Sequence, residues 1–254
     1  MPEGPSLVIA REELASFVGK KVTDVSGNSK IDQQRLLRKK LIDIRTWGKH
    51  LLLCFDGFTV RIHFLMFGTY YINSSKEAVP RLHLGFGKKY FNLYTCAVRM
   101  IEEPLDEVYD WSADVLSADW DPAAARKKLK KKPGTHVTDA LLDQEIFSGV
   151  GNIIKNEVLY RIKVHPLSTI GALPPRKLTE LVREASTYSY DFLRWKKEYT
   201  LRKHWMVHTK KTCSRDGDKI IKDYLGTTKR RTFFCNSCQV LYTGMQKEKE
   251  KWKG

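Results

Sequence analysis

Apolar and polar residues follow one period at the start of the chain and another directly after it. The first apolar residues recur three or four positions apart, at Leu7, Ala10, Leu14 and Phe17. This spacing predicts a helix that Ser6 caps and Gly19 ends. From about residue 20 to 103 the pattern instead alternates, as at residues 60–64, or runs apolar, as at 51–53. Such short strands, separated by turn residues, predict a sandwich or barrel.

The period becomes helical again from Thr135 onward. Apolar residues then recur at helical spacing in three stripes: Val137, Ala140, Leu141 and Phe147; Ile153, Val158, Leu159 and Ile162; and Leu178 through Trp195. Before these stripes, residues 104–134 have a mixed pattern and end in a basic run, 126–132, followed by Pro133-Gly134. We interpret this part of the chain as the connection to a second domain.

These patterns predict an α+β chain with two domains and a final cysteine-containing hairpin. The first domain is a β-sandwich with a leading helix, and the second is helical. We expect the following boundaries: the sandwich over residues 1–118, a linker over 119–134, the helical domain over 135–204, the hairpin over 205–243 and a basic tail over 244–254.

The charge of the chain indicates what it binds. Its 254 residues include 45 Lys and Arg against 29 Asp and Glu, a formal net charge of +16. Such an excess predicts a polyanionic partner, most often nucleic acid. No apolar run has the length of a membrane span, no secretory signal pattern is present, and the five cysteines do not form an even disulfide set. We expect an intracellular protein, cytoplasmic or nucleoid-associated, that needs no more than a monomer and no membrane.

The first residues, Met1-Pro2-Glu3-Gly4-Pro5, carry a candidate nucleophile. If Met1 is removed, the nitrogen of Pro2 is a free secondary amine, and an α-amino group titrates near pH ~7.7 to 8.0, so part of it is neutral. Glu3 supplies an adjacent carboxylate, which the positive end of the predicted helix favours. The alternative is a proline-rich terminus without a chemical role.

The most specific internal motif runs from Asp143-Gln144 to Gly149-Val150-Gly151-Asn152. Two glycines around one apolar residue, between two helical patterns, leave backbone N–H groups open at the start of a helix. That arrangement predicts a phosphate-binding turn in which Asn152 adds a side-chain donor. A plain turn between two helices is the alternative.

Two further stretches in the predicted β-domain suggest contacts with nucleic acid. Lys49, in Trp-Gly-Lys-His before a buried strand, can hold a phosphate, although a solvated lysine at a strand end is common. His63 precedes an apolar tip that contains Met66 and ends at Gly68. Such a tip is normally core, but in a DNA-binding protein it can fill the gap left by an extruded base.

Three cysteines near the end of the chain have metal-ligand spacing. Cys235 and Cys238 form a zinc knuckle, and Cys213 adds a third thiolate. The usual fourth cysteine is absent, so the fourth ligand is either Asp216, a harder ligand, or His208, at an unusual spacing. We expect a structural Zn²⁺ ion, with two arginines, Arg230 among them, on the same hairpin to clamp phosphates.

Together these motifs resemble the formamidopyrimidine-DNA glycosylase and endonuclease VIII family of DNA repair enzymes. They arrive in the family's order: the Met-Pro-Glu-Gly-Pro start, the strand lysine, the His…Gly loop, the Asp-Gln…Gly-Val-Gly-Asn-Ile turn with Asn156-Glu157, and Arg…Phe-Phe-Cys-x-x-Cys-Gln. The match covers the chain to about residue 243. It implies that the helical domain is a helix-two-turn-helix and that the hairpin is a zinc finger.

The resemblance also implies roles for single residues. Pro2 is the nucleophile that forms an iminium with the sugar, Glu3 is the acid–base residue, and Lys49 completes the catalytic set. The DNA-binding positions are His63, Met66, Asn152 and Arg230, with Met66 as the void-filling residue. Glu157 matches a structural carboxylate.

The activity implied by the resemblance is base-excision repair: removal of an oxidised base and cleavage of the strand by β,δ-elimination in damaged DNA. The loop typical of the purine-lesion branch has no counterpart between Leu82 and Glu103, where residues 90–96 stand instead. This difference favours the endonuclease VIII branch and oxidised pyrimidines. A non-catalytic damaged-DNA-binding protein of the same fold is the alternative, and an RNA-binding zinc protein is a third interpretation.

Overall fold

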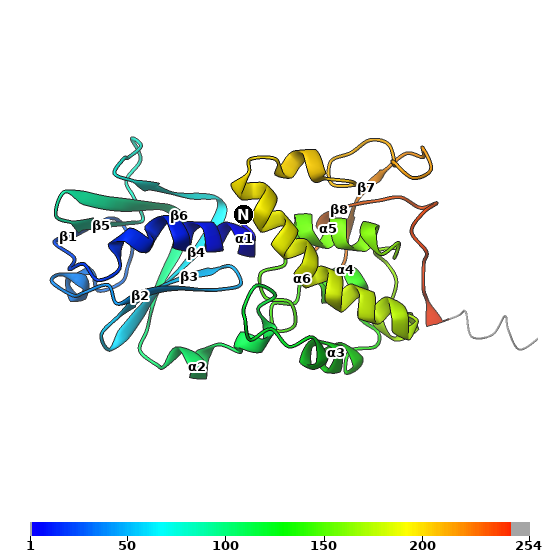
Figure 1. The fold of residues 1–254 in the computed structure, drawn as a ribbon, viewed down its shortest axis with the longest axis horizontal. Coiled ribbons are helices and arrows are strands. Elements are labelled where there is room, and N and C mark those ends of the chain that lie inside the picture. The colour runs from blue at the N-terminus through cyan, green and yellow to red at the C-terminus, as the bar shows by residue number, and fades with distance from the viewer. Residues whose placement is uncertain (1, 245–254) are drawn as a thin grey trace, which may run out of the picture. The chain divides into compact units, whose positions relative to one another are not determined.

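A computed structural model describes residues 2–244 and divides the chain into two compact units, Met1–Trp111 and Ser112–Gly254 (Figure 1). Met1 and residues 245–254, which form most of the predicted basic tail, lie outside the described residues. Each unit has its own hydrophobic core. The expected boundary after residue 118 therefore falls earlier in the structure, after Trp111.

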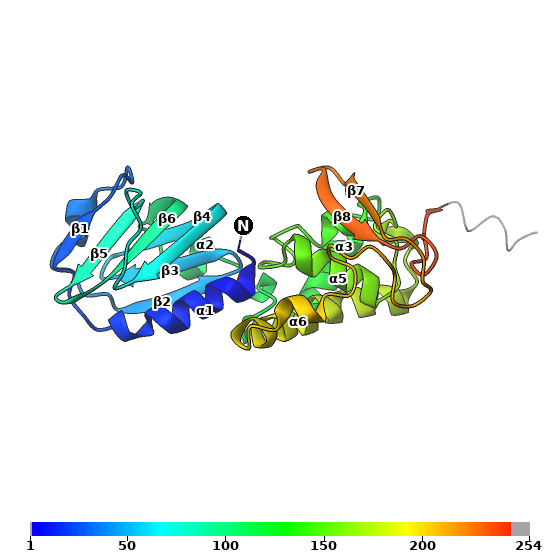
Figure 2. The same ribbon diagram turned by 90° about the horizontal axis from the view of Figure 1, so that it is seen from above.

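The first unit is a six-stranded antiparallel sheet with one helix along it (Figure 2). Its helices are α1 (Gly4–Leu14) and α2 (Leu105–Val108), with short 3-10 turns at Ala15–Phe17 and Gln33–Leu36. The strands are β1 (Asp24–Ser26), β2 (Asp43–Trp47), β3 (His50–Phe55), β4 (Phe58–Ile72), β5 (Leu82–Phe86) and β6 (Lys89–Ile101). They are hydrogen-bonded in the order β1-β5-β6-β4-β3-β2.

One large buried cluster joins most of the sheet of the first unit to α1. Leu84 of β5 and Ile44 of β2 come from strands near opposite ends of the sheet, yet both belong to one buried cluster with Leu7 of α1. The long strands β4 and β6 join the two halves, and their pairing shifts register between Phe64 and Thr69. The apolar residues of the alternating strands thus face inward, where strands from both ends of the sheet and α1 pack against one another.

Helix α1 begins earlier than predicted. Its N-cap is Glu3, in extended backbone conformation, and Pro5 stands in the first turn. A proline fits there because the first turn leaves backbone N–H groups unpaired in any case. The prediction that Ser6 caps the helix was therefore wrong, since Ser6 already donates its backbone N–H to the carbonyl oxygen of Glu3, at 2.8 Å.

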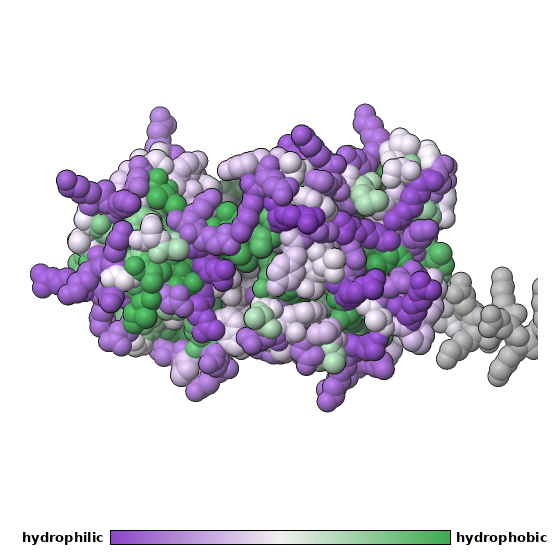
Figure 3. Space-filling model, in the orientation of Figure 1, coloured by the Kyte–Doolittle hydropathy of each residue, from purple (hydrophilic) through white to green (hydrophobic). Residues whose placement is uncertain are grey.

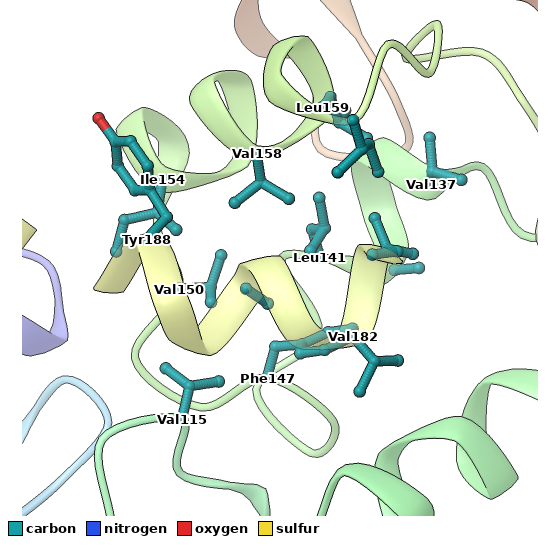
Figure 4. Packing of buried hydrophobic residues seen from close by; sticks show 14 of the residues in the cluster. Val115, Val137, Leu141, Phe147, Val150, Ile154, Val158, Leu159, Val182 and Tyr188 are labelled. Atoms are coloured by element: carbon teal, nitrogen blue, oxygen red, sulfur yellow. The ribbon is translucent and has the colours of Figure 1, made fainter. Parts of the chain in front are cut away.

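The second unit is helical and ends in a two-stranded hairpin. Its elements are the 3-10 turn Trp111–Ala113 at the division, α3 (Pro122–Lys130), α4 (Val137–Ala140), α5 (Asn152–Arg161), the 3-10 turn Ile170–Ala172, α6 (Pro175–Lys197), the 3-10 turn Leu201–His204, β7 (Ile221–Leu225) and β8 (Arg230–Phe234). Figure 4 shows Ile154 and Val158 of α5 beside Tyr188 of α6 in its core.

The predicted linker over residues 119–134 is a helix for most of its length. Asp121 caps α3 by accepting from the backbone N–H groups of Ala123 and Ala124. Ala125 and Leu129, four residues apart, are buried in the core of the second unit. The sequence did not reveal this helix, because lysines and an arginine surround its two buried residues.

The order of domains predicted from the sequence is confirmed: a β-domain with a leading helix, then a helical domain, then a cysteine-containing hairpin. Hydrophilic side chains cover much of the face of each unit that Figure 3 presents. Within residues 2–244, every helix is too short or too polar to cross a membrane.

Candidate active site and nucleic-acid interface

Pro2 and Glu3 lie at the N-terminus of α1 in the first unit. Pro2 is half-buried, and the Glu3 residue is only 5% exposed. The backbone N–H groups of the first turn and the helix dipole favour a carboxylate at this end. The residue after Pro2 thus carries a buried carboxylate, which can exchange a proton with a ligand bound next to Pro2.

Lys49 occupies a two-residue turn between β2 and β3. Trp47 and His50 form the last pair of the hairpin, and Gly48 has φ +52°, a conformation that favours glycine. The lysine therefore projects from a tight turn on a sheet, so its backbone has little freedom to move.

His63 lies beside a second histidine that the sequence did not single out. His50 and His63 pair across β3 and β4, with ring centroids 5.2 Å apart. The Nδ1 atom of His50 lies 3.2 Å from the hydroxyl of Tyr109. Burial, followed by the charge of Arg61, lowers the pKa of His50 to about 3. His50 is therefore a neutral supporting group.

His63 itself is also neutral near pH 7. Burial lowers its pKa, and a hydrogen bond to the backbone of Lys49 opposes part of that effect. A neutral imidazole has one N–H, so His63 can contact a phosphate oxygen without contributing charge by donating that N–H in place of its bond to Lys49. The only sequence signal for His50 was its position directly after Lys49 in the Trp-Gly-Lys-His motif.

The apolar tip after His63 is exposed. Leu65 is 45% exposed, Met66 59% and Phe67 85%. These residues lie inside the register shift of β4, where pairing with β6 is interrupted, and Phe67 has φ +66°. Gly68 is required behind them, because a Cβ atom there would lie 2.6 Å from the carbonyl oxygen of Thr95. This exposure excludes the alternative that the tip is core and leaves the prediction of a DNA-contacting tip open.

In the second unit, Gln144 and Asn152 organise the glycine-containing turn. The side-chain oxygen of Gln144 accepts from the N–H of Gly149, which has φ +98°, and its nitrogen donates to the carbonyl of Val150. Asn152, the first residue of α5, donates from Nδ2 to the carbonyl oxygen of Arg231, at 2.7 Å. The turn is thereby connected to strand β8.

Glu157 is fully buried on α5 and holds the segment that leads to the hairpin. Its carboxylate accepts from three consecutive backbone N–H groups, of Met206, Val207 and His208, at 2.9, 3.0 and 2.7 Å. Burial raises the pKa of Glu157, and these three hydrogen bonds oppose that rise. The arrangement fits the structural role expected for this residue.

Cys213, Asp216, Cys235 and Cys238 form a candidate metal site. One ligand atom from each lies within 4.8 Å of all the others. The sulfur atoms of Cys213 and Cys238 are 3.8 Å apart, and Asp216 Oδ2 lies 3.3 Å from the sulfur of Cys235. Tetrahedral Zn²⁺ with Zn–S bonds of about 2.3 Å places two sulfurs about 3.8 Å apart, so the residues fit this ion.

His208, the alternative fourth ligand, belongs to a different cluster. Its Nδ1 atom accepts from Asn156 Nδ2 at 3.1 Å, and its ring packs edge-on against Phe233. Asp216, in contrast, contacts the sulfur of Cys235, and its neighbour Arg215 donates to the sulfur of Cys238 and to the carbonyl of Tyr160. The structure therefore favours Asp216 over His208.

Arg230 is exposed at the start of β8, and the loop before it is anchored by a residue that sequence analysis missed. Asp139 of α4 accepts from the backbone N–H of Thr227 at 2.9 Å and from its hydroxyl at 3.3 Å. A Cβ atom on Gly226 would lie 2.3 Å from Asp139 Oδ1. Asp139 and Thr227 are 88 positions apart, and no sequence pattern indicates that they are in contact.

Two family models match the chain, one for each unit. The model for the formamidopyrimidine-DNA glycosylase N-terminal domain matches residues 1–98, and the model for its H2TH domain matches residues 112–188. The chain belongs to the formamidopyrimidine-DNA glycosylase and endonuclease VIII family. The predicted resemblance is confirmed.

The chain is similar to curated proteins of both branches of the family, and it covers very different shares of their lengths. It is 32% identical to endonuclease 8-like 3 of Xenopus laevis over 209 residues, which cover 77% of this chain and 34% of the relative. It is 26% identical to the formamidopyrimidine-DNA glycosylase of Chloroflexus aurantiacus over 280 residues, 94% of this chain and 98% of that protein. The chain spans about a third of the endonuclease 8-like 3 relative, and the higher identity supports placement nearer the endonuclease VIII branch.

The fold of the family is confirmed by solved structures. The formamidopyrimidine-DNA glycosylase of Lactococcus lactis, bound to DNA that contains an abasic site, is similar with a TM-score of 0.82 at 23% identity, over 93% of this chain and 99% of that one. At this identity the similarity establishes the fold, while the roles of individual residues depend on their chemistry.

Proposed function

We propose that this chain, once Met1 is removed, is a DNA glycosylase with abasic-site lyase activity that acts in base-excision repair. The observation that carries the proposal is the buried carboxylate of Glu3 directly after Pro2 at the start of α1. The family model for the N-terminal domain covers this pair, since it matches residues 1–98. A secondary amine with an adjacent acid is suited to covalent chemistry at a sugar carbon.

The proposed reaction begins with attack of the Pro2 nitrogen on the anomeric carbon of the damaged nucleotide. The bond to the base breaks, and the base leaves with a proton. Glu3 protonates the ring oxygen as the sugar opens. Because a secondary amine cannot lose a further proton from nitrogen, the adduct remains a cationic iminium and acts as an electron sink.

The iminium then promotes cleavage of the strand. It acidifies the adjacent carbon, and loss of a proton there expels the 3′ phosphate by β-elimination. Loss of a second proton expels the 5′ phosphate by δ-elimination, and hydrolysis of the adduct regenerates the free amine. The products are a one-nucleotide gap with phosphates at both ends and an unsaturated sugar fragment.

Residues in each unit are proposed to hold the phosphates of the damaged strand. In the first unit these are Lys49 on its tight turn and His63 with its neutral imidazole; in the second they are Asn152 and Arg230. Exposed Met66 is proposed to fill the space that the extruded base leaves. Basic contacts of this kind release counterions, so we expect the affinity of the monomer for DNA to fall steeply with salt.

The zinc ion is proposed to have a structural role only. Cys213, Asp216, Cys235 and Cys238 would hold it, and when bound it cross-links the segment before β7 to the segment after β8. It thereby fixes the hairpin that presents Arg230. Protein residues perform the covalent chemistry.

Oxidised pyrimidines are the proposed substrate class, since the chain lacks the loop typical of the purine-lesion branch and is more similar to endonuclease 8-like 3. The test uses a 5′-labelled oligonucleotide with one oxidised pyrimidine or one 8-oxoguanine, and Met-processed protein. We expect a shortened product that ends in a 3′ phosphate, formed faster on the pyrimidine lesion and lost in Glu3→Gln. Binding of both oligonucleotides without any cleavage would instead support the non-catalytic alternative.

A further inference from the structure

Two cavities follow each other along one groove of the second unit, between α3 and α6. The larger, about 540 Å³, is lined by the first half of α3 and the middle of α6. The smaller, about 260 Å³, is lined by the second half of α3, residues 170–173 and the start of α6. None of the described lining residues belongs to the DNA-binding or metal sites above, so this groove is separate from them.

Apolar residues line part of both cavities. Trp120 and Val182 line the larger one, and Ile170, Leu173 and Leu178 line the smaller one. Arg126 lines both. Its guanidinium donates to the hydroxyl of Thr179 on the facing helix, and because Arg126 lines both cavities it lies where they meet.

Every charged residue that lines the two cavities is a cation. Arg183 lines the larger cavity, Lys130 the smaller, and Arg126 both, whereas no described lining residue is acidic. Arg183 is exposed and, among residues 2–244, has neither an ion pair nor a side-chain hydrogen bond. The three cations therefore produce a positive potential that the groove itself does not neutralise.

This combination selects one class of ligand. A nucleic-acid backbone would satisfy the cations but would offer no side chains for two apolar cavities. A purely apolar ligand would fill the cavities and leave the positive charge of the lining residues unbalanced. The chain's own residues 245–254 carry four Lys and two Glu, so their charge opposes binding. A peptide with acidic and large apolar residues meets both requirements.

We propose that the groove between α3 and α6 binds an acidic peptide segment of a partner protein, with one apolar side chain in each cavity and a carboxylate at Arg126. The flanking Arg183 and Lys130 then face further acidic residues of the peptide. The proposal does not depend on the glycosylase chemistry, because no residue of the groove takes part in it.

The test is selection from a phage library of random twelve-residue peptides on the immobilised full-length chain. We expect enrichment of peptides that combine Asp or Glu with Phe, Leu, Ile or Trp. Fluorescent synthetic copies are then titrated by anisotropy against wild type, Arg183→Glu and Thr187→Trp; the tryptophan is placed to fill the larger cavity. Both substitutions should weaken binding at least tenfold, and Arg202→Glu, an exposed arginine outside the groove, should not.

The same variants separate the proposal from its rivals. A twenty-base-pair duplex should bind wild type and Arg183→Glu within a factor of two at equal salt. Circular dichroism and the thermal midpoint of each variant establish that it is folded. Three results would overturn the proposal: no enriched peptide, enriched peptides that bind all variants equally, or loss of duplex affinity in Arg183→Glu, which would make the groove a DNA contact.

Discussion

The carboxylate of Asp139 accepts two hydrogen bonds from Thr227, one from its backbone N–H and one from its hydroxyl, and thereby connects helix α4 to the loop of the β7–β8 hairpin. Arg230 follows three residues later in the chain. A residue that contacts no ligand thus positions the arginine proposed to hold a phosphate.

Substitution of Asp139 by Ala should weaken cleavage of damaged DNA by about tenfold. The substitution removes two hydrogen bonds; if about 1.5 kcal/mol of this loss, the value of one charge-assisted bond, is expressed in the placement of Arg230, cleavage slows by roughly that factor. The measurement is kcat/KM on a lesion-containing duplex. In the double variant Asp139→Ala/Arg230→Ala the loss should equal that of Arg230→Ala alone, because the carboxylate acts through the arginine. Additive losses would refute this coupling.

Asp216 should be required for metal binding. Asp216→Ala leaves three thiolates and is expected to lower zinc affinity by at least tenfold, while Asp216→Cys, which completes a four-thiolate site, should raise it. Zinc content after dialysis against a competing chelator, measured by mass spectrometry, gives the comparison. Asp223→Ala, an exposed carboxylate on β7, is the matched control. Unchanged zinc retention in Asp216→Ala would exclude this carboxylate as a ligand.

The stability of the first unit should depend on the protonation of His50. Its pKa is lowered by burial from 6.5 to about 3, so the unfolded chain binds the proton more readily than the folded one. The contribution of the neutral imidazole is complete above pH 6.5 and is lost as the pH falls toward 3, by up to ~1.4 kcal/mol per pH unit.

Urea unfolding at pH 7.5 and 5.5 measures this effect. The free energy of unfolding of the wild type should fall between these values more than that of His50→Gln, by about 1 kcal/mol. The two proteins should be compared by a signal from the first unit, because His208 in the second unit also has a pKa lowered by burial, to about 4. Equal pH dependence of the two proteins would show that His50 is not the titrating group.

The sequence predicted those parts of the molecule in which the pattern is local. The strands 60–64 and 51–53, the glycine turn before Asn152 and the metal-ligand spacing each depend on neighbours a few residues apart. The start of α1 was misplaced because Ser6 has the chemistry of an N-cap, whereas the proline before it already belongs to the first turn. Helix α3 was taken for a linker because lysines surround its two buried residues.

Contacts between distant segments could not be predicted. The pairing of Asp139 with Thr227 and of Glu157 with the N–H groups of residues 206–208 joins positions about 50 to 90 residues apart. The neutral state of His63 depends on its burial beside His50, which the strand register creates. Such features depend on how elements pack, and one sequence carries no direct record of packing.

The identity of the nucleophile is the central claim, and borohydride trapping tests it most directly. Protein whose N-terminus is confirmed by mass spectrometry to be Pro2 is incubated with an oligonucleotide that contains an abasic site, then reduced. We predict a covalent adduct that peptide mapping places on the Pro2 nitrogen and that is absent when Met1 is retained. An adduct on a lysine, or no adduct despite bound DNA, would contradict the account.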